Sequence, residues 1–170
     1  MIAKMNTVHV DHTLPESSLR VASLLASIGH DQPIVILPAS GKTAAEAAAG
    51  LGCDIAEIAK SIVFRRVADD VGVMVVTSGI NRVDVDKVAA IVGPLGKANA
   101  QFVREKTGYA IGGVCPLGHV EKTIILVDQD LLKYKTVWVA AGHPHAVFSL
   151  SPQQLIAMTN APVADVALLS

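Results

Sequence analysis

Apolar residues recur along this chain at two spacings, one typical of helices and the other typical of strands. From residue 17 to residue 28 they follow helical spacing, and Gly29 offers a place for that helix to end. Short runs rich in β-branched residues predict strands at residues 33–38, 59–67, 71–78, 123–128, 136–142 and 146–150. Further helices are predicted at residues 43–50, 83–92 and 99–106, and from residue 151 onward.

Local signals define the ends of several of these elements. Thr43 and Glu46 have the spacing of a capping box, and so has the segment 151–154, which adds a proline at the first helical position. Residues 68–70 suit a hairpin turn between two predicted strands. Because the strands come in adjacent pairs rather than in strict alternation with helices, we expect an α/β protein of the α+β kind. The pattern favours a mixed, mainly antiparallel, barrel-like sheet with surrounding helices.

The composition fits one globular domain with an aliphatic core. The chain has 170 residues, of which 51% are hydrophobic and only 4% aromatic. That length is typical of a single domain, and we expect one domain over residues 1–170, with residues 1–16 as an N-terminal extension.

Charge and apolar run length argue against several classes of protein. The net charge is −1 and the isoelectric point about 6.6, whereas dedicated nucleic-acid-binding domains more often exceed about 9, so any nucleic-acid contact is local. The apolar runs VGVMVV and TIILV fall short of the ~18 residues of a membrane helix, and the N-terminus lacks an apolar signal sequence. Cys53 and Cys115 make no disulfide framework. We expect a cytoplasmic protein that binds neither membrane nor DNA.

The stretch SGKT, residues 40–43, follows a predicted strand and opens a predicted helix, as a phosphate-binding P-loop does. The P-loop pattern needs a glycine five residues before Gly41, but Ile36 occupies that position. We therefore interpret the stretch as a turn that leads into a capped helix.

Lys60 lies in EIAKSIVF, with apolar residues close on both sides. One interpretation is a lysine at a strand end whose ammonium group reaches water. The other is a fixed cation that faces a cleft and holds a phosphate or a polar ester.

The segment GGVCPLGH, residues 112–119, combines backbone freedom with polar chemistry. Its glycines allow close backbone approach, and Pro116 stiffens the loop. Free N–H groups in such a turn can bind an anion or stabilise a developing oxyanion. The alternative is an ordinary tight connection.

Cysteine and histidine side chains near this segment suggest two further hypotheses. Cys115, His119, His143 and His145 could form a metal site, but their spacing matches no standard zinc pattern, so we expect neither a metal nor another cofactor. Cys115 could be a nucleophile if its pKa were lowered beside a base, or a small residue that lines a pocket.

Three stretches carry a resemblance to a known family: LGCDIAEIAKSIVFR, YAIGGVCPLGH and WVAAGHPHAVFSLSPQQLIAMTNAPVADV. In order and spacing they resemble the YbaK/ProX family of aminoacyl-tRNA deacylases, relatives of the editing domain of bacterial prolyl-tRNA synthetases, over roughly residues 17–168. The resemblance implies the same barrel-like fold.

The resemblance also implies roles for single residues. Lys60 would hold the terminal nucleotide and act with Gly112 in catalysis, the Gly-x-x-x-Pro loop would contact the aminoacyl group, and a second glycine loop would close the pocket. The expected substrate-binding residues are Gly113, Val114, Cys115, Pro116, His119, Gly142, His143 and His145.

The activity implied is trans-editing, the hydrolysis of the ester in mischarged aminoacyl-tRNA, with a tRNA synthetase as a further partner. The tRNA would be that for proline, and the small loop residues suggest alanine, cysteine, serine or 2-aminobutyrate as the wrong amino acid. The alternative is a non-catalytic module of the same fold that binds tRNA or a synthetase. We expect few phosphate contacts and a shallow salt dependence. The candidates are Lys60, Arg65, Arg66, Arg104, Lys106 and Lys122.

Overall fold

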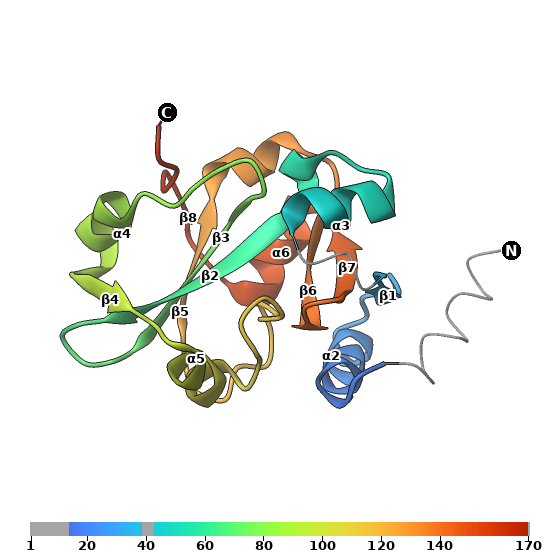
Figure 1. Ribbon diagram of the computed structural model, residues 1–170, viewed down its shortest axis with the longest axis horizontal. Coiled ribbons are helices and arrows are strands. Elements are labelled where there is room, and N and C mark those ends of the chain that lie inside the picture. Colours follow the sequence, from blue (N-terminus) through green and yellow to red (C-terminus); the bar gives the residue numbers. More distant parts are fainter. Residues whose placement is uncertain (1–13, 39–42, 170) are drawn as a thin grey trace, which may run out of the picture.

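The strands of the computed structural model, which describes residues 14–38 and 43–169, form two sheets (Figure 1). The three-stranded sheet has the order β1 (Val35–Ile36), β7 (Ala146–Leu150), β6 (Val137–His143). The five-stranded sheet has the order β4 (Leu95–Lys97), β2 (Ala59–Arg66), β3 (Gly72–Ser78), β5 (Ile124–Asp128), β8 (Val163–Ala164).

Antiparallel pairing predominates, as the paired strands of the sequence predicted. The three-stranded sheet is antiparallel throughout, and β2 is antiparallel to both β3 and β4. Among the described strands, the parallel pairings are those of β5 with β3 and of β5 with β8. The expectation of one barrel-like sheet is corrected, because the described strands divide between two sheets. The sheets meet at a single parallel bridge between Ile58 and Trp138, so strand pairing does not continue from β2 into β6.

Five α-helices of the described chain surround these sheets. They are α2 (Glu16–Ser27), α3 (Ala44–Leu51), α4 (Val85–Val92), α5 (Ala100–Thr107) and α6 (Pro152–Thr159), with 3-10 turns η1 (Ile55–Glu57) and η2 (Gln129–Lys133). Both predicted capping boxes are confirmed, at the starts of α3 and α6. In Figure 1, β2 and β3 cross the middle of the view, α4 lies at the β4 end, and α2 lies beside the three-stranded sheet.

Strand β3 is the centre of the core, since all seven of its residues are buried. Val73 and Val75 face one way and pack with Val88 of α4, whereas Met74 and Val76 face the other way into the larger core cluster. Because both faces are covered, the carboxyl end of β3 is held firmly where the candidate site begins.

Several elements differ from the prediction. Strand β1 has only two residues, while β4 and β8 were not predicted at all. Ser40, Gly41 and Lys42 of the P-loop-like stretch lie outside the described residues, as do residues 1–13 of the expected N-terminal extension. No helix in the described ranges is both long enough and apolar enough to cross a membrane.

Candidate functional site

A cavity of about 350 Å³ lies where α3, the start of β2, the loop at Gly112 and strands β6 and β7 come together. Its wall is mostly apolar. Its polar side chains come from Thr43, Lys60 and Ser61, and its apolar wall includes Ile58, Ile111, Trp138, Pro144 and Val147. The cavity thus brings Lys60 and Gly112, far apart in the sequence, into one site.

The Lys60 ammonium group is fixed in this wall. Its Nζ donates a hydrogen bond to the backbone carbonyl of Asn81, at 2.7 Å. Burial, and to a lesser extent the positive charge of Arg82, lowers the pKa of Lys60 below its usual value. Of the two interpretations of Lys60, the structure favours the cation that faces a cleft.

The two glycine loops meet at the mouth of the cavity. A methyl group on Gly113 would lie 2.7 Å from the Cα and carbonyl carbon of His143, so only glycine allows this approach. Gly112 has a φ of +88°, a conformation that favours glycine. The Gly113 N–H donates to the carbonyl of Ala110 at 2.9 Å. The N–H groups of Gly112 and Val114 donate no hydrogen bond to another described residue.

A smaller cavity of about 200 Å³ shares Ser61, Ile62, Ile111 and Gly112 with the lining of the first. The rest of its lining is apolar: Val63, Ala98, Val103 and Val114. The hydroxyl oxygen of Ser61 is buried and has no hydrogen-bond partner in the described part of the chain. The sequence analysis missed Ser61, although its place next to Lys60 was a signal for it.

Cys115 and Pro116 lie beneath the loop, in the core. Cys115 is 0% exposed, and its Sγ accepts a hydrogen bond from the Leu117 N–H at 3.4 Å. Burial raises the pKa of the Cys115 thiol to about 12, so the thiol is protonated near neutral pH. This environment is the opposite of the one that activates a nucleophilic cysteine.

His119 ties the loop to the start of β5. Its Nε2 lies 2.7 Å from the carbonyl oxygen of Cys115, which can only accept, so Nε2 carries a proton. Its Nδ1 lies 2.9 Å from the hydroxyl of Thr123, which can donate to it. Burial lowers the pKa of His119 and favours this neutral form.

The second glycine loop carries the other two histidines. The His145 N–H donates to Nδ1 of His143 at 3.1 Å. The two imidazole rings lie edge to face, with 5.5 Å between their centroids. Gly142 has a φ of +91°, and its carbonyl accepts a hydrogen bond from the Ser17 hydroxyl of α2. Within residues 14–38 and 43–169, no three histidine, cysteine or acidic side chains are grouped as metal ligands.

Comparison with known proteins places this geometry in a family. Residues 38–158 match the aminoacyl-tRNA editing domain. The chain belongs to that family. A Bacillus subtilis (strain 168) protein without an assigned function, YwhH, is 32% identical over 117 residues, which are 68% of this chain and 74% of YwhH.

Solved structures agree with the assignment to the editing-domain family. One, provisionally assigned as a trans-editing enzyme for prolyl tRNA synthetase, is 42% identical with a TM-score of 0.87 and covers 92% of this chain and 100% of its own. The hypothetical protein APE2540 is 33% identical with a TM-score of 0.80. The match covers 88% of this chain and 99% of APE2540. The resemblance found in the sequence is confirmed at the level of the family.

The expected phosphate contacts of this editing domain divide into two groups. Three of the six basic side chains form ion pairs: Arg65 with Asp70, Arg66 with Asp69 and Lys106 with Glu121, at 2.6, 2.7 and 3.0 Å. Within the described chain, Lys60, Arg104 and Lys122 form no ion pair. The paired side chains are less available to phosphates, and the small number of phosphate contacts stays a prediction.

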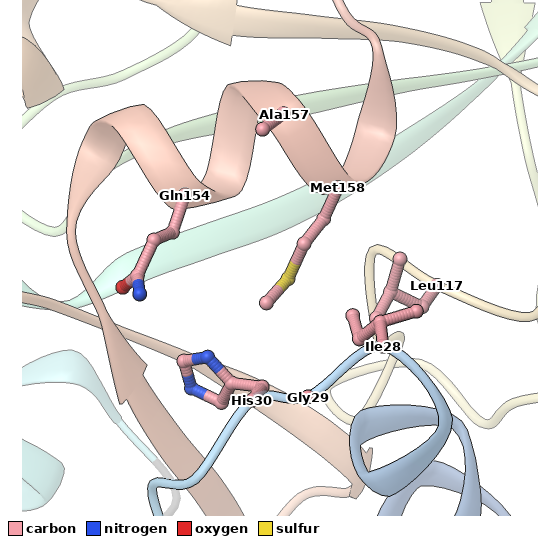
Figure 2. A pocket seen from close by; sticks show the side chains of 7 residues that line it. All are labelled: Ile28, Gly29, His30, Leu117, Gln154, Ala157 and Met158. Carbon is pink, nitrogen blue, oxygen red and sulfur yellow. The ribbon is translucent and has the colours of Figure 1, made fainter.

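A second cavity, of about 390 Å³, lies between the end of α2 and α6. Figure 2 shows Gln154 and Met158 projecting from α6 toward His30, with Ile28 and Leu117 beside them. Although this cavity is slightly larger, its described lining residues include no lysine or arginine that could attract a polyanionic substrate. The cavity at Lys60 is therefore the candidate functional site of the domain.

Proposed function

We propose that this chain works as one free-standing editing domain that hydrolyses the ester bond of mischarged aminoacyl-tRNA in trans. The observation that carries the proposal is the shared cavity of Lys60 and Gly112, in a chain of the editing-domain family. In this proposal the cavity supplies a cation that binds the nucleotide and backbone N–H groups that bind the ester.

In this mechanism the protein orients an ester that is already activated. The Lys60 ammonium holds a phosphate of the terminal nucleotide, and the N–H groups of Gly112 and Val114 face the ester carbonyl. The free hydroxyl of the terminal ribose positions a water, whose oxygen attacks the carbonyl carbon. The bond from that carbon to the ribose oxygen breaks, the ribose oxygen takes a proton from the attacking water, and the amino acid leaves with the water oxygen in its carboxyl group. Orientation and oxyanion stabilisation together supply several kcal/mol of the barrier, so no side-chain nucleophile is needed.

The other predicted residues support this arrangement. Gly142, His143 and His145 close the cavity over the aminoacyl group, and Gly113 allows the two loops to meet. Cys115, Pro116 and His119 hold the first loop in shape from behind, because their contacts are to the core and to backbone.

The size of the smaller cavity supports a small wrong amino acid: alanine, cysteine, serine or 2-aminobutyrate. Its lining is apolar apart from Ser61, whose hydroxyl oxygen is buried and unpaired among the described residues. Discrimination of one methylene in such a pocket is worth about 1–3 kcal/mol, so the selectivity will be graded.

A tRNA for proline is the proposed carrier, which the 42% identical trans-editing relative supports. The partner is then an aminoacyl-tRNA, with a tRNA synthetase as the proposed protein partner. Because charged tRNAs are made and used in the cytoplasm, the proposal places the protein there.

The test is deacylation of tRNA for proline charged separately with alanine, cysteine, serine, 2-aminobutyrate and proline. We expect rapid loss of at least one wrong amino acid, with proline spared, and a rate about 100-fold lower in Lys60→Ala. Lys135→Ala, which removes an exposed lysine that is not a candidate phosphate contact, is the matched control and should keep the wild-type rate. If no charged tRNA is hydrolysed although tRNA binds, the chain is a non-catalytic binding module instead.

A further inference from the structure

A chain of hydrogen bonds runs from the Lys60 ammonium group into the core. Lys60 Nζ donates to the backbone carbonyl of Asn81 at 2.7 Å. The side-chain Nδ2 of Asn81 donates in turn to Oδ2 of Asp128 and to Oδ2 of Asp130, each at 2.8 Å. Asn81 is therefore held at its side chain by two carboxylates while its carbonyl holds the lysine.

The far end of this chain is anchored rigidly. Asp128, the last residue of β5, is 0% exposed. Its Oδ2 also accepts from the hydroxyl of Thr77 at 2.6 Å, and its Oδ1 accepts from the Asp130 N–H at 3.0 Å. A buried carboxylate is costly unless it is hydrogen-bonded in this way, so its position is strongly specified. Thr77 is also the cross-strand partner of Lys60 in the β2–β3 pairing, so the network closes on itself.

This arrangement positions the Lys60 ammonium group without neutralising its positive charge. A carboxylate bonded directly to the ammonium would orient it but would also cancel the charge that a phosphate needs. A carbonyl occupies one of the three N–H donors and leaves both the charge and two donors free. The acidic groups act on the neutral amide of Asn81, one residue removed from the cation.

We infer that Asn81 is a positioning residue, whose side chain, clamped by Asp128 and Asp130, holds the Lys60 ammonium group at the wall of the cavity. The inference rests on the proposed function for its kinetic consequence, since Lys60 is proposed to bind the substrate. The sequence analysis did not find Asn81, because its partners lie 21, 47 and 49 residues away along the chain.

The kinetic test is a double-mutant cycle on deacylation of mischarged tRNA. Asn81→Ala should lower kcat/KM about tenfold in the wild-type background, and less than twofold when Lys60→Met is already present, because it acts through Lys60. Ser151→Ala, which removes the capping side chain of α6 away from Lys60, is the control for lost stability and should leave kcat/KM unchanged. If the effects of Asn81→Ala and Lys60→Met are simply additive, the inference is overturned although the deacylase function stands.

A second measurement does not depend on any activity. The lysine ¹H–¹⁵Nζ spectrum of the wild-type protein should contain a distinct Lys60 ammonium signal, assigned by its loss in Lys60→Arg. In Asn81→Ala that signal should broaden or move to the position of exposed lysines, while Ser151→Ala retains it. An unchanged signal in Asn81→Ala overturns the inference. Absence of deacylation by wild type would instead overturn the proposed function and leave this spectrum as the test of Asn81.

Discussion

The β2 side of the cavity depends on a polar network, whereas the loop side depends on the close approach of two backbones. Lys60 is held by a hydrogen bond that leads to a buried carboxylate. Gly113 is held by contact with the backbone of His143, with no charged group involved. The comparison teaches that the two walls have different weaknesses. The first should respond to changes of charge and pH, and the second to changes of volume.

The largest effect is expected from Gly113→Ala, which adds volume to the loop side. The new Cβ would lie 2.7 Å from backbone atoms of His143, which cannot rotate away as a side chain can. We expect the free energy of unfolding to fall by about 1–3 kcal/mol, as for other overpacked sites. We expect kcat/KM to fall about 100-fold, because displacement of a positioned group by about 1 Å can cost that much.

Gly52→Ala is the matched control for Gly113→Ala. Gly52 has a φ of +72°, but no atom lies within 4 Å of the place that a methyl group would take there, so alanine adds strain without a collision. It should cost about 1 kcal/mol of stability and leave kcat/KM at the wild-type value. Normal deacylation by Gly113→Ala would show that the two loops need not meet.

The β2 side should be sensitive to alkaline pH. Burial and Arg82 lower the pKa of Lys60 from its usual value of 10.5. The ammonium therefore loses its proton, and with it its charge, at a lower pH than an exposed lysine does. We expect kcat/KM, corrected for spontaneous ester hydrolysis, to fall about tenfold per pH unit above that lowered pKa. Lys60→Arg keeps its charge throughout this range, and its profile should lack the alkaline decline. A decline of equal size in both proteins would assign it to a different group.

An intermediate effect is expected at His119, which supports the loop side from behind. Its pKa is lowered by burial, so the unfolded chain binds its proton more readily than the folded one. The stability contributed by the neutral ring is fully present above about pH 6.5, the pKa of histidine in the unfolded chain. It is lost as the pH falls through the lowered pKa of His119 in the folded protein. Thermal unfolding at pH 7.5 and 5.5 should show this loss in wild type, and His119→Gln should show less of it. At pH 7.5 the substitution itself should cost about 1 kcal/mol in lost hydrogen bonds.

The smallest effect on activity is expected from Cys115→Ala. Because the thiol is buried and its pKa is raised to about 12, we expect kcat/KM to stay within about threefold of wild type. The free energy of unfolding should fall by about 1 kcal/mol, since a buried group is removed from the core. A loss of activity beyond tenfold in a folded Cys115→Ala protein would revive the nucleophile hypothesis.

Features that depend on neighbouring residues were predictable from the sequence. The capping boxes at Thr43 and at Ser151 formed as predicted, because each needs only residues three positions apart. The hairpin turn at 68–70 is also present, between β2 and β3. The glycine pattern of residues 112–119 correctly marked a segment of irregular backbone next to a cavity.

Features that depend on distant partners were not predictable in this way. Strands β4 and β8 have three and two residues, and they exist because a longer strand provides a ladder for them. The division into two sheets depends on where Trp138 meets Ile58. Asn81 has no local motif, since its importance comes from Lys60 and Asp128, which the fold brings to it.

The register of the β2–β3 hairpin has a consequence for the order in which the protein acquires its site. Arg65 pairs with Gly72 beside the turn, whereas Lys60 pairs with Thr77 at the open end. A hairpin closes its short loop at the least entropic cost, so pairing is expected to spread from the turn toward Lys60. A chain collapsed around β3 would then be largely folded before it could hold its cation in place.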